Sequence, residues 1–139
     1  MAAGLERFVT AQAPIYQQVL GELRAGAKRS HWMWFVFPQI AGLGRSPTAQ
    51  FYAIRDLTEA REYLADETLG PRLRECTDTV IGWTGRKSAE AIFGPVDAVK
   101  FCSSMTLFEA AGGSEPFSQA LDGFYGGGRD AATLEKIGV

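Results

Sequence analysis

Apolar side chains recur at intervals of three and four residues along most of the chain, which is the spacing of one face of an α-helix. The pattern predicts helices over residues 5–12, 15–25 (with Pro14 near its first turn), 47–54, 57–65, 68–82, 88–93, 96–111 and 115–125, and a last helical turn capped by Asp130. Three of these helices are expected to begin at Ser46, at Asp56, which stands three residues before Glu59 in a capping pattern, and at Ser88. No segment alternates apolar and polar residues convincingly. The sequence therefore predicts a mainly α fold, a single compact multihelical domain over residues 1–139.

The segment expected to be helical over 96–111 is apolar around nearly its whole circumference, which predicts burial on most sides. A polar stripe nevertheless runs along it, with Asp97, Lys100 and Ser104 at positions i, i+3 and i+7 and with Ser103 and Thr106 beside them. Leaving one buried polar group unpaired costs about 1–3 kcal/mol. This stripe must therefore face partners, water or a ligand.

The most unusual stretch of the chain is KRSHWMWFVFPQIAGLG, residues 28–44, which leads from a basic pair into an aromatic run. It holds two of the three tryptophans, Trp32 and Trp34, and the single histidine, His31. Six consecutive apolar residues, 32–37, fit a short helix or an extended segment equally well. They also fit two roles, a buried core segment or the wall of a pocket. Both roles can hold together, with one aromatic face in the core and its edge lining the pocket.

Composition narrows the classes of partner. Among 139 residues the formal net charge is −2, so there is no overall positive field for a nucleic acid backbone, and we expect no nucleic acid partner. Cys76 and Cys102 make no metal-ligand spacing with His31, which predicts free thiols and no metal site. No cofactor motif is present. Because the chain shows no signal-peptide pattern and no long apolar run, we expect a cytoplasmic protein without a membrane segment.

A series of motifs runs along almost the whole chain: HWMWFVFPQIAGLGRS, YAI with Glu59-Ala60, LGPRL, IFG, Asp97 and Lys100 with SSMTLF, and Asp130 with Thr133-Leu134. In these motifs the chain resembles the bacterial domain-of-unknown-function family 1810, some of whose members are labelled calpastatin-like. The resemblance implies a small helical domain with a shared groove, and no particular reaction. The chain departs from the family pattern at Asp66-Glu67, where a His-Pro pair is usual, and at Cys102, where a basic residue is common.

The order of the aromatic stretch and the late helix is also similar, more faintly, to a helical family linked to NAD and ADP-ribose metabolism that includes N-glycosidases. Gln50 or Phe51 stands in the region where that family places a catalytic glutamate. This likeness implies kinship of fold more than shared chemistry.

Each polar candidate has a functional and a structural interpretation. His31 and Asp97 could act as general acid or base. The structural interpretations are that His31 fixes its loop through its ring nitrogens and that Asp97 is an N-cap or a first-turn carboxylate, with capping favoured. Lys100 is expected at a pocket, paired to Asp97 or facing an anion, because lysine is rarely buried alone. Ser103 and Ser104 could contact a ligand or bond back to the preceding turn. Gln39 could contact a base edge or loop backbone.

The leading hypothesis from these candidates is a small-molecule pocket between residues 28–44 and the helix 96–111. Trp32 or Trp34 would stack on a flat ring, while Lys28, Arg29 and Lys100 would attract the anionic part of a nucleotide or ADP-ribose-like ligand. An enzyme built this way would be a hydrolase of N-glycosidic or phosphate-ester bonds. The alternative is a protein-interaction module with exposed aromatics, as a monomer or a homodimer. The pocket hypothesis requires contact between the tryptophans and Lys100 or Ser104.

Overall fold

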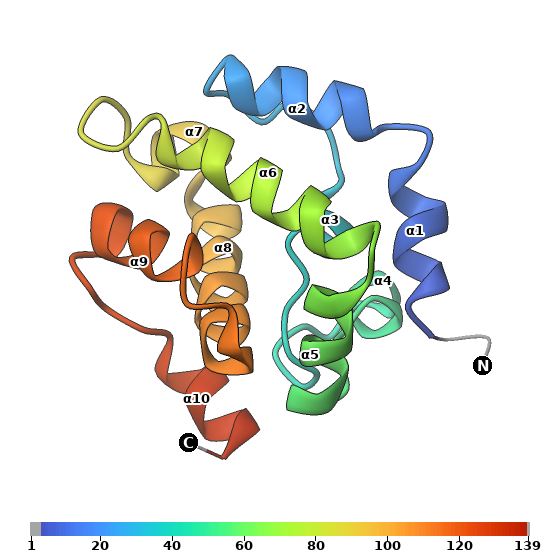
Figure 1. Cartoon of the computed structure of the whole chain (residues 1–139). Helices are drawn as coiled ribbons and strands as arrows, with labels where there is room; N and C mark the ends of the chain where they lie inside the picture. The colour runs from blue at the N-terminus through green and yellow to red at the C-terminus, as the bar shows by residue number, and fades with distance from the viewer. Residues whose placement is uncertain (1–3, 139) are drawn as a thin grey trace.

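The computed structural model describes residues 4–138, which form ten α-helices and almost no β-structure (Figure 1). The helices are α1 (Glu6–Gln12), α2 (Tyr16–Arg24), α3 (Met33–Val36), α4 (Pro47–Phe51), α5 (Leu57–Ala65), α6 (Leu69–Ile81), α7 (Ala89–Phe93), α8 (Pro95–Phe108), α9 (Phe117–Tyr125) and α10 (Ala131–Ile137), with a π-helical turn η1 (Glu109–Gly113) directly after α8. The predicted mainly α fold is confirmed. None of the helices in this range is both long and apolar enough to cross a bilayer.

Several helix starts coincide with the polar residues that the sequence indicated. The side chains of Ser46, Asp56, Ser88 and Asp130 each accept a hydrogen bond from a backbone N–H in the first turn of α4, α5, α7 and α10. These caps satisfy amide groups that have no partner inside the helix. The helix expected over 47–54 ends earlier, at Phe51, because Ile54 forms a parallel β-bridge with Ile40 instead.

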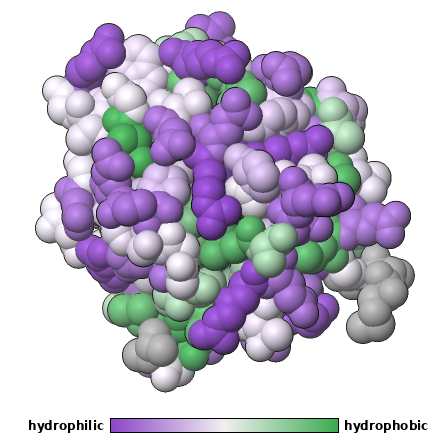
Figure 2. All heavy atoms as spheres, in the orientation of Figure 1, coloured by the Kyte–Doolittle hydropathy of each residue, from purple (hydrophilic) through white to green (hydrophobic). Residues whose placement is uncertain are grey.

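Helix α8 lies at the centre of the molecule and contacts α5, α7, α9, α10 and η1 (Figure 1). Its buried residue Phe101 meets the ring of Phe37 edge-on and stacks on Phe93. The expectation of burial on nearly all sides is wrong at the first turns, where Val96 and Val99 are 67% and 61% exposed. On the face drawn in Figure 2, apolar residues reach the surface as separate patches among hydrophilic ones.

The aromatic stretch folds as one short helical turn, α3, between two residues whose backbone angles are neither helical nor extended. Trp32, before it, has φ −138°, and Phe37, after it, has φ −125°. Both of these side chains are buried in the core, whereas Trp34 and Phe35 are only partly buried. The stretch therefore serves both roles that the sequence left open.

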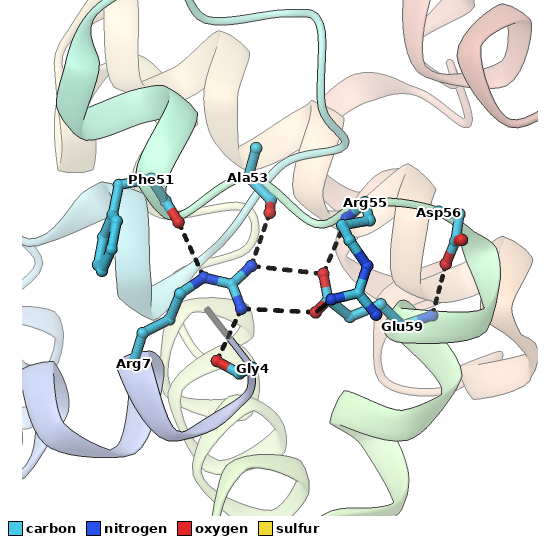
Figure 3. Close-up of polar contacts among 7 residues, drawn as sticks. All are labelled: Gly4, Arg7, Phe51, Ala53, Arg55, Asp56 and Glu59. Atoms are coloured by element: carbon cyan, nitrogen blue, oxygen red, sulfur yellow. Dashed lines mark hydrogen bonds and ion pairs between the residues drawn. The ribbon is translucent and has the colours of Figure 1, made fainter. Parts of the chain in front are cut away.

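A buried ion pair ties the N-terminal helix to the start of α5 (Figure 3). The guanidinium of Arg7 contacts the carboxylate of Glu59 at 3.4 Å and donates to the carbonyl oxygens of Phe51 and Ala53 at 2.8 Å. Glu59 also accepts from the backbone N–H of Arg55 at 2.8 Å. These contacts fix the backbone of residues 51–55.

The segment fixed by Arg7 in turn holds the backbone around Gln39. The N–H of Ile54 donates to the carbonyl of Gln39, and the N–H of Ala41 donates to the carbonyl of Ile54, both at 2.8 Å. The loop that follows the aromatic turn therefore has a defined path although it is not helical. Gln39 is placed on the side of this loop that faces α8.

Candidate functional site

Asp97 stands between two lysines that come from different parts of the chain. Its carboxylate lies 2.9 Å from the ammonium of Lys28 and 3.5 Å from that of Lys100, one turn further along α8. Asp97 occupies the first turn of α8, where the helix dipole favours a negative charge, and it does not cap the helix. Of the two arrangements expected for Lys100, pairing to Asp97 or facing an anion, the structure shows the pairing to Asp97.

Each of these lysines also contacts a tryptophan of the aromatic stretch. The ammonium of Lys28 lies 5.1 Å from the ring centroid of Trp32, and that of Lys100 lies 5.1 Å from the ring centroid of Trp34. Both distances are within cation–π range. The expected contact between the aromatic stretch and α8 is therefore confirmed.

The two tryptophans are not equivalent, which corrects the expectation that either could stack on a ligand. Trp32 is 1% exposed, and its indole N–H donates to Glu22 at 2.9 Å. Its ring is enclosed by the core, where it packs beside Phe37. Only Trp34, which is partly exposed, keeps ring surface available to a ligand.

A groove of about 530 Å³ opens beside this cluster. It is lined by Gln39, Leu43, Gly44, Pro95, Val96, Val99, Lys100, Ser103, Asp130 and Ala132. Its volume lies within the range of about 300–1,000 Å³ that is usual for small-molecule sites. Three of the predicted ligand residues, Gln39, Lys100 and Ser103, thus line one groove. Trp34 lines a narrow enclosed gap that shares Gln39 and Gly44 with it.

His31 and Arg29 lie apart from the groove. His31 is exposed and lines a separate shallow hollow of about 590 Å³ with Trp34, Phe51 and four neighbouring residues. Arg29 is also exposed, and its backbone N–H donates to Glu22. Of the two candidate catalytic residues, only Asp97 stands beside the groove. Within residues 4–138, no group of three or more His, Cys, Asp and Glu side chains is arranged to hold a metal ion.

The hydroxyl groups of α8 divide between the two interpretations that the sequence left open. Ser103 Oγ lies 3.2 Å from the carbonyl oxygen of Val99 and 3.1 Å from Asp130 Oδ2, and Thr106 bonds back to Cys102 at 2.8 Å. Ser104 does neither. Its Oγ is fully buried without a hydrogen-bond partner among the described residues, and it does not line the groove. Ser103 therefore bonds back to the preceding turn, and it is the serine of the two that lines the groove although it is only 2% exposed.

Asp130 is a groove residue that the sequence indicated only as a helix cap. Its Oδ2 accepts from Ser103 and from the Thr133 backbone N–H at 3.0 Å, and its own N–H donates to Thr106 Oγ1 at 3.0 Å. These bonds fasten the start of α10 to α8. Asp130 lies 27 residues from Ser103 and 24 from Thr106 in the sequence, so no local sequence signal indicates this role.

Glu22 is a second residue that the sequence did not single out, and it organises the entry to the aromatic stretch. Its carboxylate accepts hydrogen bonds from the backbone of Arg29 and Ser30, from the Ser30 hydroxyl, from the Trp32 indole and from Gln18. Partial burial alone would raise the pKa of Glu22, but these hydrogen bonds outweigh it and lower that pKa to about 2.

The lowered pKa makes a prediction about stability and pH. Because the ordinary pKa is 4.5 and the folded value about 2, the stabilisation from ionised Glu22 is complete above pH 4.5 and is lost as pH falls toward 2. In urea unfolding, Glu22→Gln should therefore be clearly less stable than the unmodified chain at pH 7, and this difference should narrow by pH 3. The exposed Glu62→Gln on α5 is the control. An equal difference at both pH values would show that the charge of Glu22 is unimportant.

Comparisons with known proteins agree with this architecture. A family model described as "Protein of unknown function (DUF1810)" matches residues 2–137. The chain is also similar to the conserved hypothetical protein Rv1873 from Mycobacterium tuberculosis, a crystal structure, at 53% sequence identity and a TM-score of 0.92. That similarity covers 97% of this chain and 96% of the other. No curated protein matches the chain. The chain therefore belongs to the DUF1810 family.

Proposed function

We propose that this protein binds a small anionic ligand with a flat ring, of the nucleotide or ADP-ribose type, in the groove between residues 28–44 and α8. The observation that carries the proposal is the placement of Lys100 at the groove, between the Asp97 carboxylate and the partly exposed ring of Trp34. Lys100 lines the groove, and the Trp34 ring that it contacts lines the adjoining gap, so a ligand that stacks on Trp34 must reach from the groove past Gln39 and Gly44. A cation beside an aromatic ring supplies the two features that a nucleotide requires.

The charges of the cluster favour an anion. Two ammonium groups share one carboxylate, so Lys28, Asp97 and Lys100 together carry a net positive charge. The side chain of Lys100 is 26% exposed and that of Lys28 only 9%. An incoming phosphate would therefore be met by Lys100, while Lys28 keeps Asp97 in place.

The remaining polar groups of the groove suit the neutral parts of such a ligand. Gln39 carries both an amide donor and an amide acceptor, which can pair with a base edge. The Ser103 hydroxyl already donates its hydrogen within the protein, so Ser103 and the Asp130 carboxylate can both accept hydrogen bonds from ribose hydroxyl groups. Apolar surface from Leu43, Val96 and Val99 completes the lining.

The reaction that this arrangement supports best is hydrolysis of an N-glycosidic bond. Asp97 would accept a proton from a water molecule while the oxygen of that water bonds to the anomeric carbon. The electron pair of the breaking C–N bond would leave with the base nitrogen, which takes a proton from solvent. Asp97 does not line the groove itself, but its carboxylate lies 3.5 Å from the ammonium of the groove residue Lys100, whereas His31 lines a separate hollow. Asp97 is therefore the base proposed for this step.

The proposal is tested by thermal shift with ADP-ribose, NAD, nucleotides and inorganic phosphate. A ligand that binds only the native state raises the unfolding midpoint by mass action. Trp34→Ala and Lys100→Ala should each weaken binding roughly tenfold, a loss of about 1.4 kcal/mol. The exposed Lys136→Ala, which removes the same charge from α10, should respond like the unmodified chain. Equal responses from Lys100→Ala and Lys136→Ala would contradict the proposed site.

The exposure of Val96 and Val99 favours a second candidate, a protein-interaction module. Exposed apolar surface of this kind marks interfaces when it is contiguous. Two results together would fit this second function. None of the ligands would raise the unfolding midpoint, and Val99→Asp would make the protein more monomeric in sedimentation.

A further inference from the structure

We infer that a second binding site lies on the side of the exposed Val99 that faces away from the groove. This site takes a small organic cation such as an alkylammonium group. A hollow of about 480 Å³ lies there between α7, α8, α9 and the segment that leads into α10. Its wall is apolar and aromatic, from Val99, Phe124 and Tyr125, and its charged members are Glu90, Arg129 and Asp130. The hollow shares Pro95, Val99 and Asp130 with the groove, but the inference does not rest on the function proposed there.

The charge of this hollow is negative because its single cation is already neutralised. Arg129 pairs with Glu109 through two nitrogens and contacts Asp122 at 3.3 Å, and it also donates to the carbonyl of Gly127 at 2.7 Å. Its guanidinium is therefore engaged by two carboxylates that do not line the hollow. It contributes little attraction for an anion there.

The two carboxylates that do line the hollow lack a cation. No ion pair within residues 4–138 joins a lysine or arginine to Glu90 or to Asp130. All the hydrogen bonds to the Asp130 side chain in this range use Oδ2, which leaves Oδ1 for a ligand donor. Two uncompensated carboxylates in one hollow favour a positively charged occupant.

The other members of the hollow suit the apolar part of such a ligand. Phe124 and Tyr125 pack on Phe101 from the surface side, and aromatic rings attract ammonium groups, quaternary ones included. The Tyr125 hydroxyl is engaged, since it donates to the carbonyl of Ala98 at 2.5 Å. Burial, and then the nearby Asp130, raises the pKa of the Cys102 thiol, so Cys102 remains neutral. The hollow therefore combines negative charge with aromatic and aliphatic surface.

The test uses choline and its neutral carbon analogue, 3,3-dimethyl-1-butanol, which has the same shape without the charge. In ¹H–¹⁵N NMR titrations, choline should give saturable shifts confined to residues 88–90, 98–102 and 124–131. The alcohol should bind at least about tenfold more weakly, because it has neither the cation–π attraction nor the attraction to the carboxylates. Glu90→Gln, at an exposed position, should lower the choline affinity roughly fivefold.

The matched control is Glu67→Gln, which changes the net charge equally at an exposed position outside the hollow. It should bind choline as the unmodified chain does. Equal binding of choline and the alcohol, equal weakening by the two Glu→Gln changes, or no saturable response would each overturn the inference. The thermal-shift test of the groove with anionic ligands gives a separate result. Failure of one site is therefore distinguishable from failure of the other.

Discussion

Replacing Glu59 with alanine is expected to lower the free energy of unfolding by about 3–5 kcal/mol, the usual cost of removing one partner of a buried ion pair. The carboxylate is 1% exposed and is the counter-charge of Arg7, whose own side chain is 3% exposed. The change leaves the Arg7 guanidinium buried without that charge. It also removes the acceptor for the backbone N–H of Arg55. Because the same contacts fix residues 51–55, the loop that carries Gln39 should loosen as well (Figure 3).

This expectation is checked by urea and thermal unfolding of Glu59→Ala beside Glu62→Ala. Glu62 lies on the same helix but is exposed, and such a surface change usually stays within about 0.5 kcal/mol. The unfolding midpoint of Glu59→Ala should fall by roughly 10 °C or more. If the two variants melt together, Arg7 must be stabilised mainly by its backbone carbonyl partners.

The helices were predictable because their signals are local. The capping residues Asp56, Ser88 and Asp130 each stand directly before an apolar periodic segment, and the structure confirms all three caps. Glu59 was visible only as part of such a capping pattern. Its partner Arg7 lies 52 residues away in the sequence, so nothing near either residue indicates the pair.

The sequence could not predict that Trp32 is buried whereas Trp34 is partly exposed. The two residues have the same side chain and lie two positions apart, at the start of a one-turn helix. A separation of two residues on a helix turns the side chains by about 200°, so one must point nearly opposite to the other. Which of them enters the core depends on where α8 lies. Periodicity can identify a face but cannot say which neighbour covers it.

The same limit explains Val96 and Val99. An apolar helix suggests burial, and the rest of α8 follows that rule with Phe101, Met105 and Phe108 fully buried. The first turns are uncovered because the chain that returns as α9 and α10 leaves a hollow on each side of Val99. Asp130 was missed as a lining residue for this reason too, since the position of α10 against α8 is a tertiary contact.

Changing Asp97 to asparagine is expected to separate binding from chemistry at the groove. In the free protein, Asp97 neutralises part of the charge on Lys28 and Lys100. The isosteric amide removes that competition, so inorganic phosphate or ADP-ribose should bind Asp97→Asn roughly tenfold more tightly than the unmodified chain. The amide cannot accept the proton of a water molecule. Any hydrolysis should therefore fall by about 10²–10⁴-fold, the usual contribution of a general base.

Calorimetric titration measures the affinity, and chromatography of the released base measures the hydrolysis. Asp78→Asn on α6 is the control, because it makes the same chemical change at an exposed site and should alter neither quantity. Weaker anion binding by Asp97→Asn would mean that the carboxylate chiefly holds the two lysines in position. The direction of the affinity change therefore decides whether Asp97 competes with the ligand for Lys100 or prepares Lys100 to receive it.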